Sequence, residues 1–131
     1  MFTFNFPNDI SAVYIIYSAK DNRKIPIYVG ESSSLWGRIG DYCRASFKSS
    51  TDFKVGEAIK YLRERRQNII VDIRHKDIHT KKERKEKEGA TIKEIGRHLL
   101  NELKGYNYKN AHIEEQRKRV KEFCDLYFNS L

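Results

Sequence analysis

Tyr28, Gly30, Arg38 and Tyr42 lie close together in the sequence, and tyrosine and arginine side chains are residue types that could form a functional site. Arg38 follows Gly30 by eight residues, and Tyr42 follows Arg38 by four. The planar guanidinium of an arginine stays charged and can donate two hydrogen bonds to phosphate oxygens. These residues also have an ordinary explanation, because tyrosines are common on half-buried sheets and arginines on solvated helices. The question is whether the fold brings Tyr28, Arg38 and Tyr42 to one place.

The charge of the chain favours a polyanionic partner. Its 131 residues include 26 Lys and Arg but 18 Asp and Glu, which gives a net charge of +8. A basic surface binds nucleic acid by releasing the counterions of the phosphates, and solubility alone is the alternative explanation. With 39% hydrophobic and 12% aromatic residues, we expect one folded domain over residues 1–131.

The strand patterns predict a hairpin followed by a third strand. The β-branched and aromatic runs 12–17 and 25–29 are typical of strands, and the turn-forming residues between them predict a hairpin. A third strand is predicted over residues 68–73. The segment 75–88 is densely charged with both signs, which is typical of an exposed helix or a mobile loop.

Helical periodicity predicts the remaining elements. Helices are expected over 35–43, on a segment after the loop 49–52, over 91–103 and over about 111–131. The third of these begins at a capping box, Thr91 to Glu94, and the aromatic stripe of the last is expected to pack against the sheet. The order β-β-α-α-β-α plus a C-terminal helix indicates an α+β fold, a small three-stranded, mainly antiparallel sheet flanked by helices.

Cysteine usage and the N-terminal residues favour an intracellular protein. Cys43 and Cys124 are far apart in helix-like segments, so we expect two buried thiols and no disulfide framework. The N-terminus lacks the positive charge and the long apolar run of a signal peptide, and no stretch reaches the length that a membrane span needs. A cytoplasmic location is therefore expected.

Two tripeptides on the predicted hairpin resemble a known family. Ala12-Val13-Tyr14 and Tyr28-Val29-Gly30 resemble the motifs that name the GIY-YIG nucleases. The spacings of Arg38 and Tyr42 resemble those of the family's arginine and of the His or Tyr that follows it. The similarity covers about residues 12–110, where Asn107 matches the family's terminal asparagine. The resemblance implies an endonuclease that hydrolyses DNA phosphodiester bonds with one divalent cation, Mg²⁺ or Mn²⁺.

The resemblance also implies a role for each residue. Tyr14 is a candidate general base, acting together with Tyr28. A tyrosine with its free pKa near 10 needs a neighbouring cation to favour the phenolate. Arg38 would bind the phosphate, Tyr42 would orient the nucleophile or the leaving group, and Gly30 would let the backbone and the first helix approach closely.

The metal ligand is where the sequence departs from the family pattern. Glu94 is the candidate, since it precedes Asn107 by thirteen residues. The family places an apolar pair three and four residues after the acid, and counting back from Leu99 and Leu100 gives Gly96 instead. Glu88 is nearer the expected face but lies beyond Gly89, outside the predicted helix. Either Glu94 reaches the metal through an irregular helix, or the ligand is lost.

Exposed cations are expected to guide the DNA backbone without reading bases. The candidates are Lys60, Arg63 and Arg66 on the second helix and the lysine-rich segment 81–88. Target choice would then come from loops, DNA shape, self-association or a protein partner. The alternatives are a nucleic-acid-binding module of the same fold that cuts poorly or not at all, and a basic adaptor whose C-terminal helix docks on another protein.

Overall fold

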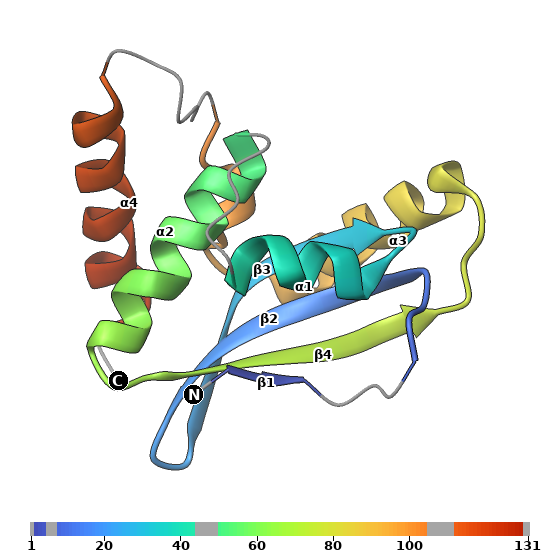
Figure 1. Ribbon diagram of the computed structural model, residues 1–131, viewed down its shortest axis with the longest axis horizontal. Coiled ribbons are helices and arrows are strands. Elements are labelled where there is room, and N and C mark those ends of the chain that lie inside the picture. Colours follow the sequence, from blue (N-terminus) through green and yellow to red (C-terminus); the bar gives the residue numbers. More distant parts are fainter. Residues whose placement is uncertain (1, 5–7, 44–49, 105–111, 130–131) are drawn as a thin grey trace.

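The sheet is built around the predicted hairpin. A computed structural model describes residues 2–4, 8–43, 50–104 and 112–129. Strands β2 (Ala12–Lys20) and β3 (Arg23–Ser32) pair antiparallel, and β4 (Asn68–Lys76) pairs antiparallel with the other side of β2 (Figure 1). The predicted three-stranded antiparallel sheet is confirmed, with β2 as its central strand.

A fourth strand extends this sheet. The short strand β1 (Phe2–Phe4) pairs parallel with β4, which gives the order β1-β4-β2-β3 in the described part of the chain. Its three residues are too few to show an alternating pattern, so the sequence did not predict it. Strand β3, which carries the second tripeptide, is at the edge of the sheet.

Helices cover both faces of the sheet (Figure 1). Helices α1 (Leu35–Cys43) and α2 (Ser50–Glu64) pack on the face that presents Tyr14 and Tyr28. Helix α3 (Lys81–Ile95) packs on the opposite face, which presents Val13 and Val29. Neighbouring residues of β2 therefore serve two separate cores, as strand alternation requires. The predicted loop 49–52 is wrong in part, because α2 already begins at Ser50.

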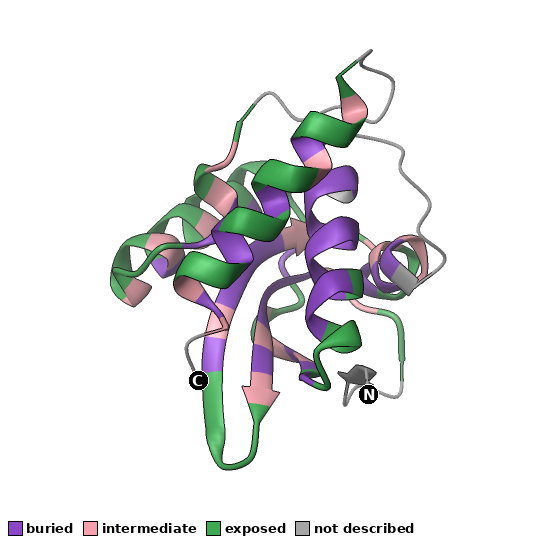
Figure 2. Cartoon of the chain, turned by 90° about the vertical axis from the view of Figure 1, so that its left-hand side faces the viewer, coloured by how far each residue is buried: buried purple, intermediate pink, exposed green. Residues whose placement is uncertain are grey.

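The last helix packs on another helix. The predicted C-terminal helix is α4 (Ile113–Tyr127), and it packs against α2, whereas packing against the sheet was expected. The Tyr61 hydroxyl of α2 donates to Asp125 of α4 at 2.8 Å, and Arg117 Nε lies 3.1 Å from Glu57 Oε1. Figure 2 shows that the buried residues of the two helices face each other.

Helix α3 begins and ends earlier than predicted. The Thr80 hydroxyl caps it by accepting from the Glu83 N–H at 3.2 Å, and Gly96 ends it in the left-handed conformation at φ 60°. The prediction of a helix over 91–103 is therefore wrong. Thr91 is a buried residue inside α3, where its hydroxyl donates to the Lys87 carbonyl. A short 3-10 helix, η1 (Leu100–Glu102), follows.

The cysteines and the possible membrane spans were the two remaining subjects of the sequence analysis. Cys124 is a buried free thiol, and burial raises its pKa to about 12, while the side chain of Cys43 lies outside the described part. Within the described residues, no helix combines the length and the apolar character that crossing a membrane requires.

Candidate active site

Tyr14 and Gly30 face each other across the hairpin. The two residues are register partners in the β2–β3 ladder, and the Tyr14 ring lies directly against the Gly30 backbone. A Cβ atom at Gly30 would come within 2.4 Å of both the Cζ and the hydroxyl oxygen of Tyr14. No side chain larger than hydrogen fits there unless the tyrosine moves. The glycine of the second tripeptide therefore positions the tyrosine of the first.

Helix α1 brings a third aromatic residue to this pair. The Tyr42 hydroxyl oxygen lies 2.9 Å from the Tyr14 hydroxyl oxygen, and both residues are buried. Burial raises the pKa of Tyr42 well above its usual value. Negative charge on Tyr14 or Tyr28 would raise the pKa further, and the positive charge of Arg38 lowers it. Tyr42 therefore stays a neutral hydroxyl that can donate to Tyr14.

Strand alternation places Tyr28 on the same face as Tyr14, because the pairing is regular from Tyr14 and Gly30 to Ile16 and Tyr28. A β-bulge follows directly after Tyr28. Ile16 pairs with Tyr28 but Tyr17 pairs with Pro26, so Ile27 is the extra residue of the edge strand. The Tyr28 ring centroid lies 6.5 Å from that of Tyr14 at a tilt of 55°. The pair is close enough for one substrate group to contact both.

Asp9 fixes the helix that carries Arg38. Its carboxylate accepts from the Ser34 hydroxyl at 2.7 Å and from the Trp36 N–H at 3.0 Å, and these hydrogen bonds lower the pKa of Asp9. Ser34 in turn caps α1 by accepting from the Gly37 N–H at 3.3 Å. Asp9 was not predicted from the sequence, because it lies 25 residues before Ser34 in the chain.

Arg38 is half-buried on α1, one turn before Tyr42. Its positive charge lowers the pKa of Tyr42, so the two side chains are close enough to interact electrostatically. The structure thus brings together Tyr14, Tyr28, Arg38 and Tyr42, which we call the tyrosine cluster, around Gly30.

The two glutamates near the end of α3 face different strands. The Glu94 side chain is 64% exposed, and its Oε1 lies 2.6 Å from Arg74 Nη2 of β4. The Glu88 side chain is only 16% exposed, and its Oε1 lies 3.5 Å from Lys85 Nζ. Lys85 also approaches Glu31 Oε2 of β3 at 3.7 Å, so Glu88 lies on the β3 side. The described contacts of Glu94 therefore do not include the tyrosine cluster.

Glu88 lies inside the helix. The sequence indicated a helix that starts after Gly89, whereas α3 runs through that glycine without interruption. The residues three and four positions after Glu88 are the buried Thr91 and the half-buried Ile92, which packs in the α3 core. Burial raises the pKa of Glu88, and the charge of Glu31 adds to this, while Lys85 opposes it.

Glu31 joins β3 to α3. It directly follows Gly30, its side chain is 12% exposed, and it accepts from Arg84 Nε at 2.9 Å. Arg84 is itself buried and also donates to the Ile78 carbonyl. Two carboxylates and two cations therefore meet where α3 crosses β3.

An asparagine side chain pairs with the edge of β3. Asn101 Oδ1 accepts from the Val29 N–H at 2.9 Å, and Asn101 Nδ2 donates to the Val29 carbonyl at 2.7 Å. Both backbone groups of Val29 that face away from β2 are thus satisfied, which fixes β3 between Tyr28 and Gly30. The asparagine expected to have a backbone role was Asn107, which lies outside the described residues.

Comparison with known proteins identifies the family. The family model described as the GIY-YIG catalytic domain matches residues 10–107, which include every element of the tyrosine cluster. The chain belongs to the GIY-YIG nuclease family. Comparisons with curated proteins and with solved structures give no significant match.

GIY-YIG nucleases generally use a divalent metal, and such an ion needs oxygen ligands, which carboxylates supply. The described residues contain no group of three or more His, Cys, Asp or Glu side chains that could hold a metal. Mg²⁺, however, keeps several waters and is commonly bound through one or two carboxylates together with substrate phosphates. Glu88, largely buried beside β3 and close to Glu31, fits that mode better than the exposed, ion-paired Glu94.

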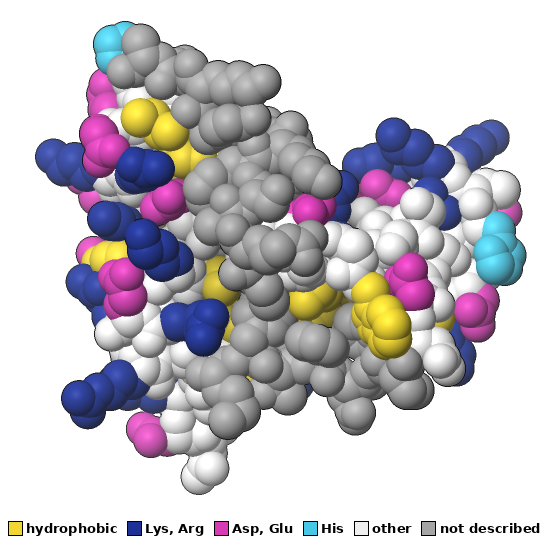
Figure 3. Space-filling view, in the orientation of Figure 1, with side chains coloured by type: hydrophobic (Ala, Val, Ile, Leu, Met, Phe, Trp, Pro, Cys, Tyr) yellow, Lys and Arg dark blue, Asp and Glu magenta, His cyan; other side chains and the backbone are white. Residues whose placement is uncertain are grey.

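The cations expected to contact DNA are exposed. Lys60 and Arg63 lie on α2, and Arg66 follows its end. Figure 3 shows Lys and Arg side chains interleaved with acids over α2 and α4, and a second basic group over α3. The lysine-rich segment 81–88 is the first half of α3, on the other face of the sheet from α2.

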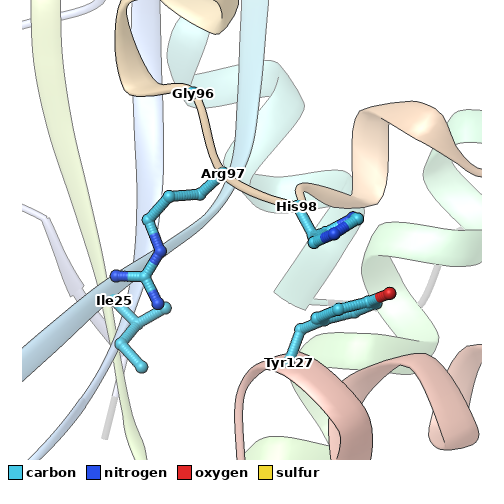
Figure 4. A pocket seen from close by; sticks show the side chains of 5 residues that line it. All are labelled: Ile25, Gly96, Arg97, His98 and Tyr127. Carbon is cyan, nitrogen blue, oxygen red and sulfur yellow. The ribbon is translucent and has the colours of Figure 1, made fainter.

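A separate hollow lies where α3 ends against α4. It has a volume of about 250 Å³ and is lined by Ile25, Gly96, Arg97, His98 and Tyr127 (Figure 4). The His98 and Tyr127 rings stack with centroids 3.9 Å apart, and His98 Nδ1 lies 2.8 Å from Glu102 Oε1. None of its lining residues belongs to the tyrosine cluster, so the hollow is separate from the candidate active site.

Proposed function

We propose that this GIY-YIG nuclease is a DNA endonuclease that hydrolyses phosphodiester bonds with Mg²⁺ or Mn²⁺. The observation that supports the proposal is the convergence of Tyr14, Tyr28, Arg38 and Tyr42 around Gly30. Hydrolysis of a phosphodiester needs a proton acceptor for the attacking water and positive charge at the phosphoryl oxygens. The cluster offers phenol groups for the first need and a guanidinium for the second.

Arg38 is the phosphate-binding residue in this proposal. Its planar guanidinium group can donate two hydrogen bonds to phosphate oxygens, and the group stays protonated near neutral pH. Half-burial on α1 strengthens such a contact, because fewer waters screen the charge than on an open surface.

Tyr14 and Tyr28 are the candidate proton acceptors. A hydrogen bond donated by the neutral Tyr42 hydroxyl would stabilise a phenolate on Tyr14, and the nearby guanidinium adds positive charge. Tyr28 is slightly more exposed than Tyr14, at 7% against 1%, which places it nearer the incoming substrate. Tyr42 acts through Tyr14 in this scheme and is a positioning residue.

Glu88, supported by Glu31, takes the metal-holding role that the sequence had given to Glu94. Both carboxylates lie at β3, the strand that carries Tyr28 and Gly30, and β3 is an edge strand of the described sheet. The divalent ion, when bound, supplies positive charge beside the phosphoryl oxygens. Arg84 and Lys85 hold the two carboxylates in place.

The proposed function is tested by incubating the protein with supercoiled plasmid and with branched DNA in Mg²⁺ or Mn²⁺. We expect nicked or linear products with either metal and none in EDTA. Intact DNA with both metals and both substrates, together with salt-sensitive binding, would refute the endonuclease and leave a nucleic-acid-binding module. Failure to bind DNA at low salt would favour an adaptor role.

A further inference from the structure

A basic hollow lies at the other end of β2 from the tyrosine cluster. Its volume is about 380 Å³, and it is lined by Lys20, Glu64, Arg65, Arg66, Gln67 and Asn129. These residues come from the end of β2, from the end of α2 with the turn after it, and from the segment that directly follows α4. Three cations against one carboxylate make it a site for an anion, and we call it the basic hollow.

Two of its cations have no carboxylate partner. Neither Lys20 nor Arg66 forms an ion pair within the described part of the chain. Arg65 is more engaged, because its guanidinium carbon lies 3.7 Å from the Tyr61 ring centroid and its Nε lies 3.9 Å from Asp125 Oδ1. The charges of Lys20 and Arg66 are therefore available to a ligand.

Behind these cations lies a network of side-chain amides, of which Gln67 is buried and Asn129 half-buried. Gln67 is 3% exposed, accepts from the Ser18 hydroxyl of β2 and donates to Asn129 Oδ1 at 2.5 Å. Asn129 in turn donates to Asp125 Oδ1 of α4 at 2.6 Å. The network joins the hairpin, the end of α2 and the end of α4, so the basic hollow is formed before any ligand arrives.

Arg66 occupies a backbone position that favours glycine. Its φ is 63°, and the chain turns there through hydrogen bonds from Arg66 N–H to Arg63 carbonyl and from Gln67 N–H to Leu62 carbonyl, at 3.0 and 3.1 Å. Glycine is the usual residue at such a helix C-terminus, and a residue with a side chain is strained there. A strained residue with an unpaired charge is a reason to look for a functional contact.

We propose that the basic hollow binds a backbone phosphate of the DNA duplex about six base pairs from the scissile phosphate. This inference rests on the proposed DNA substrate and on placing the reaction at the tyrosine cluster. Six residues of β2 separate Tyr14 from Lys20, which is about 20 Å. Helix α2, 15 residues long, spans a similar length of about 22 Å. A duplex advances about 3.4 Å per base pair, so either length corresponds to about six base pairs.

Lys60 and Arg63 lie exposed along α2 between these two ends. They continue the positive surface from the middle of the helix toward Arg66, which agrees with one backbone following the helix. No base is read by such contacts, so the basic hollow would set how long a duplex must be, and not which sequence it has.

The test is equilibrium binding of labelled hairpin duplexes of about 4 to 20 base pairs in EDTA, where no cleavage occurs. The variants are wild type, Lys20→Gln/Arg66→Gly and the charge-matched control Lys93→Gln/Lys118→Gln, whose lysines are exposed on α3 and α4. Arg66→Gly relieves the left-handed backbone, so the Lys20→Gln/Arg66→Gly double variant is expected to unfold at a temperature no lower than wild type. Loss of binding without loss of folding then reports the contact itself.

For the longest duplexes, the slope of log K against log[salt] should be about 1.8 smaller for the Lys20→Gln/Arg66→Gly variant than for wild type. Raising salt from about 50 to 200 mM would then weaken wild-type binding about tenfold more than that of the variant. This difference should disappear when the duplex is shorter than about six base pairs, and the control should behave as wild type. The proposal would be overturned if the salt slopes of wild type and the Lys20→Gln/Arg66→Gly variant were equal, or if they differed by the same amount at every duplex length. An equal change of slope in the control would overturn it as well. Because cleavage is not measured, a protein that binds DNA but never cuts it would refute the proposed function without affecting this result.

Discussion

The Tyr14 and Tyr42 hydroxyl oxygens lie 2.9 Å apart although 28 residues separate the two positions in the chain. The contact joins the central strand of the sheet to α1 inside the core, where both residues are buried. One hydroxyl donates and the other accepts, so the removal of either leaves a buried polar atom without its partner. The relationship couples the first tripeptide tyrosine to the helix that carries Arg38.

A double-mutant cycle measures this coupling. Tyr14→Phe and Tyr42→Phe are each expected to lower the free energy of unfolding by about 1–3 kcal/mol, because a buried hydroxyl loses its partner. The double variant should lose less than the sum, because no orphaned hydroxyl then remains. Urea denaturation gives the three values, and additive losses would show that the hydroxyls do not interact in solution.

Gly30→Ala tests the close approach of Tyr14 to the strand backbone. The new methyl group would meet the Tyr14 ring at 2.4 Å, so we expect a loss of about 1–3 kcal/mol in the free energy of unfolding and a displaced tyrosine. Gly89→Ala is the matched control, because a Cβ there meets nothing within 4 Å and alanine favours α3 by about 1 kcal/mol. Equal effects of the two substitutions on stability would contradict the geometry.

The buried Lys54 makes the stability of the folded protein depend on pH. The residue is 5% exposed, its Nζ donates to the Leu103 carbonyl at 2.6 Å, and burial, with Lys104 nearby, lowers its pKa from 10.5 to about 8. The unfolded chain therefore binds more protons than the folded chain between these values, so this residue makes stability rise as the pH increases from about 8 to 10.5.

Substitution isolates that contribution. The stability of wild type relative to Lys54→Met should increase across this pH range in urea denaturation, whereas relative to the exposed Lys60→Met it should stay flat. A flat difference for Lys54→Met as well would mean that the ammonium is not desolvated in the folded protein.

The two glutamates of α3 provide a direct comparison of metal ligands. Glu88→Gln should abolish Mg²⁺-dependent cleavage and weaken Mn²⁺ binding measured by calorimetry, because an amide is a poorer ligand than a carboxylate for a hard cation. Glu94→Gln should change neither, since that side chain is exposed and paired with Arg74. The reverse pattern would restore Glu94 as the metal ligand.

The hairpin and the tyrosine cluster could be predicted from the sequence because their signals are local. Alternating β-branched and aromatic residues define β2 and β3, and the spacing of Gly30, Arg38 and Tyr42 fixes where α1 begins. The family resemblance rested on these residues, and the family is confirmed.

The features that the sequence did not reveal depend on tertiary structure. The charged segment 75–88 fitted either an exposed helix or a mobile loop, and the next helix was expected to begin at Thr91, so Glu88 was left outside it. The Asn101 contact joins residues 72 positions apart, and the Asp9 contact to Ser34 spans 25, so no local pattern marks either. The ends of α3, in contrast, carry local signals, because Thr80 caps its start and Gly96 ends it in the left-handed conformation.

Cleavage by an Arg38→Ala variant tests the central claim most directly. The matched control is Arg97→Ala, which removes an exposed arginine outside the tyrosine cluster. Both proteins are compared with wild type for the rate of plasmid nicking in Mg²⁺ and for DNA binding in EDTA. We predict that Arg38→Ala cuts about 10²–10³-fold more slowly while it retains most of its binding, and that Arg97→Ala cuts at the wild-type rate. Cleavage by Arg38→Ala at the wild-type rate would contradict the assignment of phosphodiester hydrolysis to the tyrosine cluster.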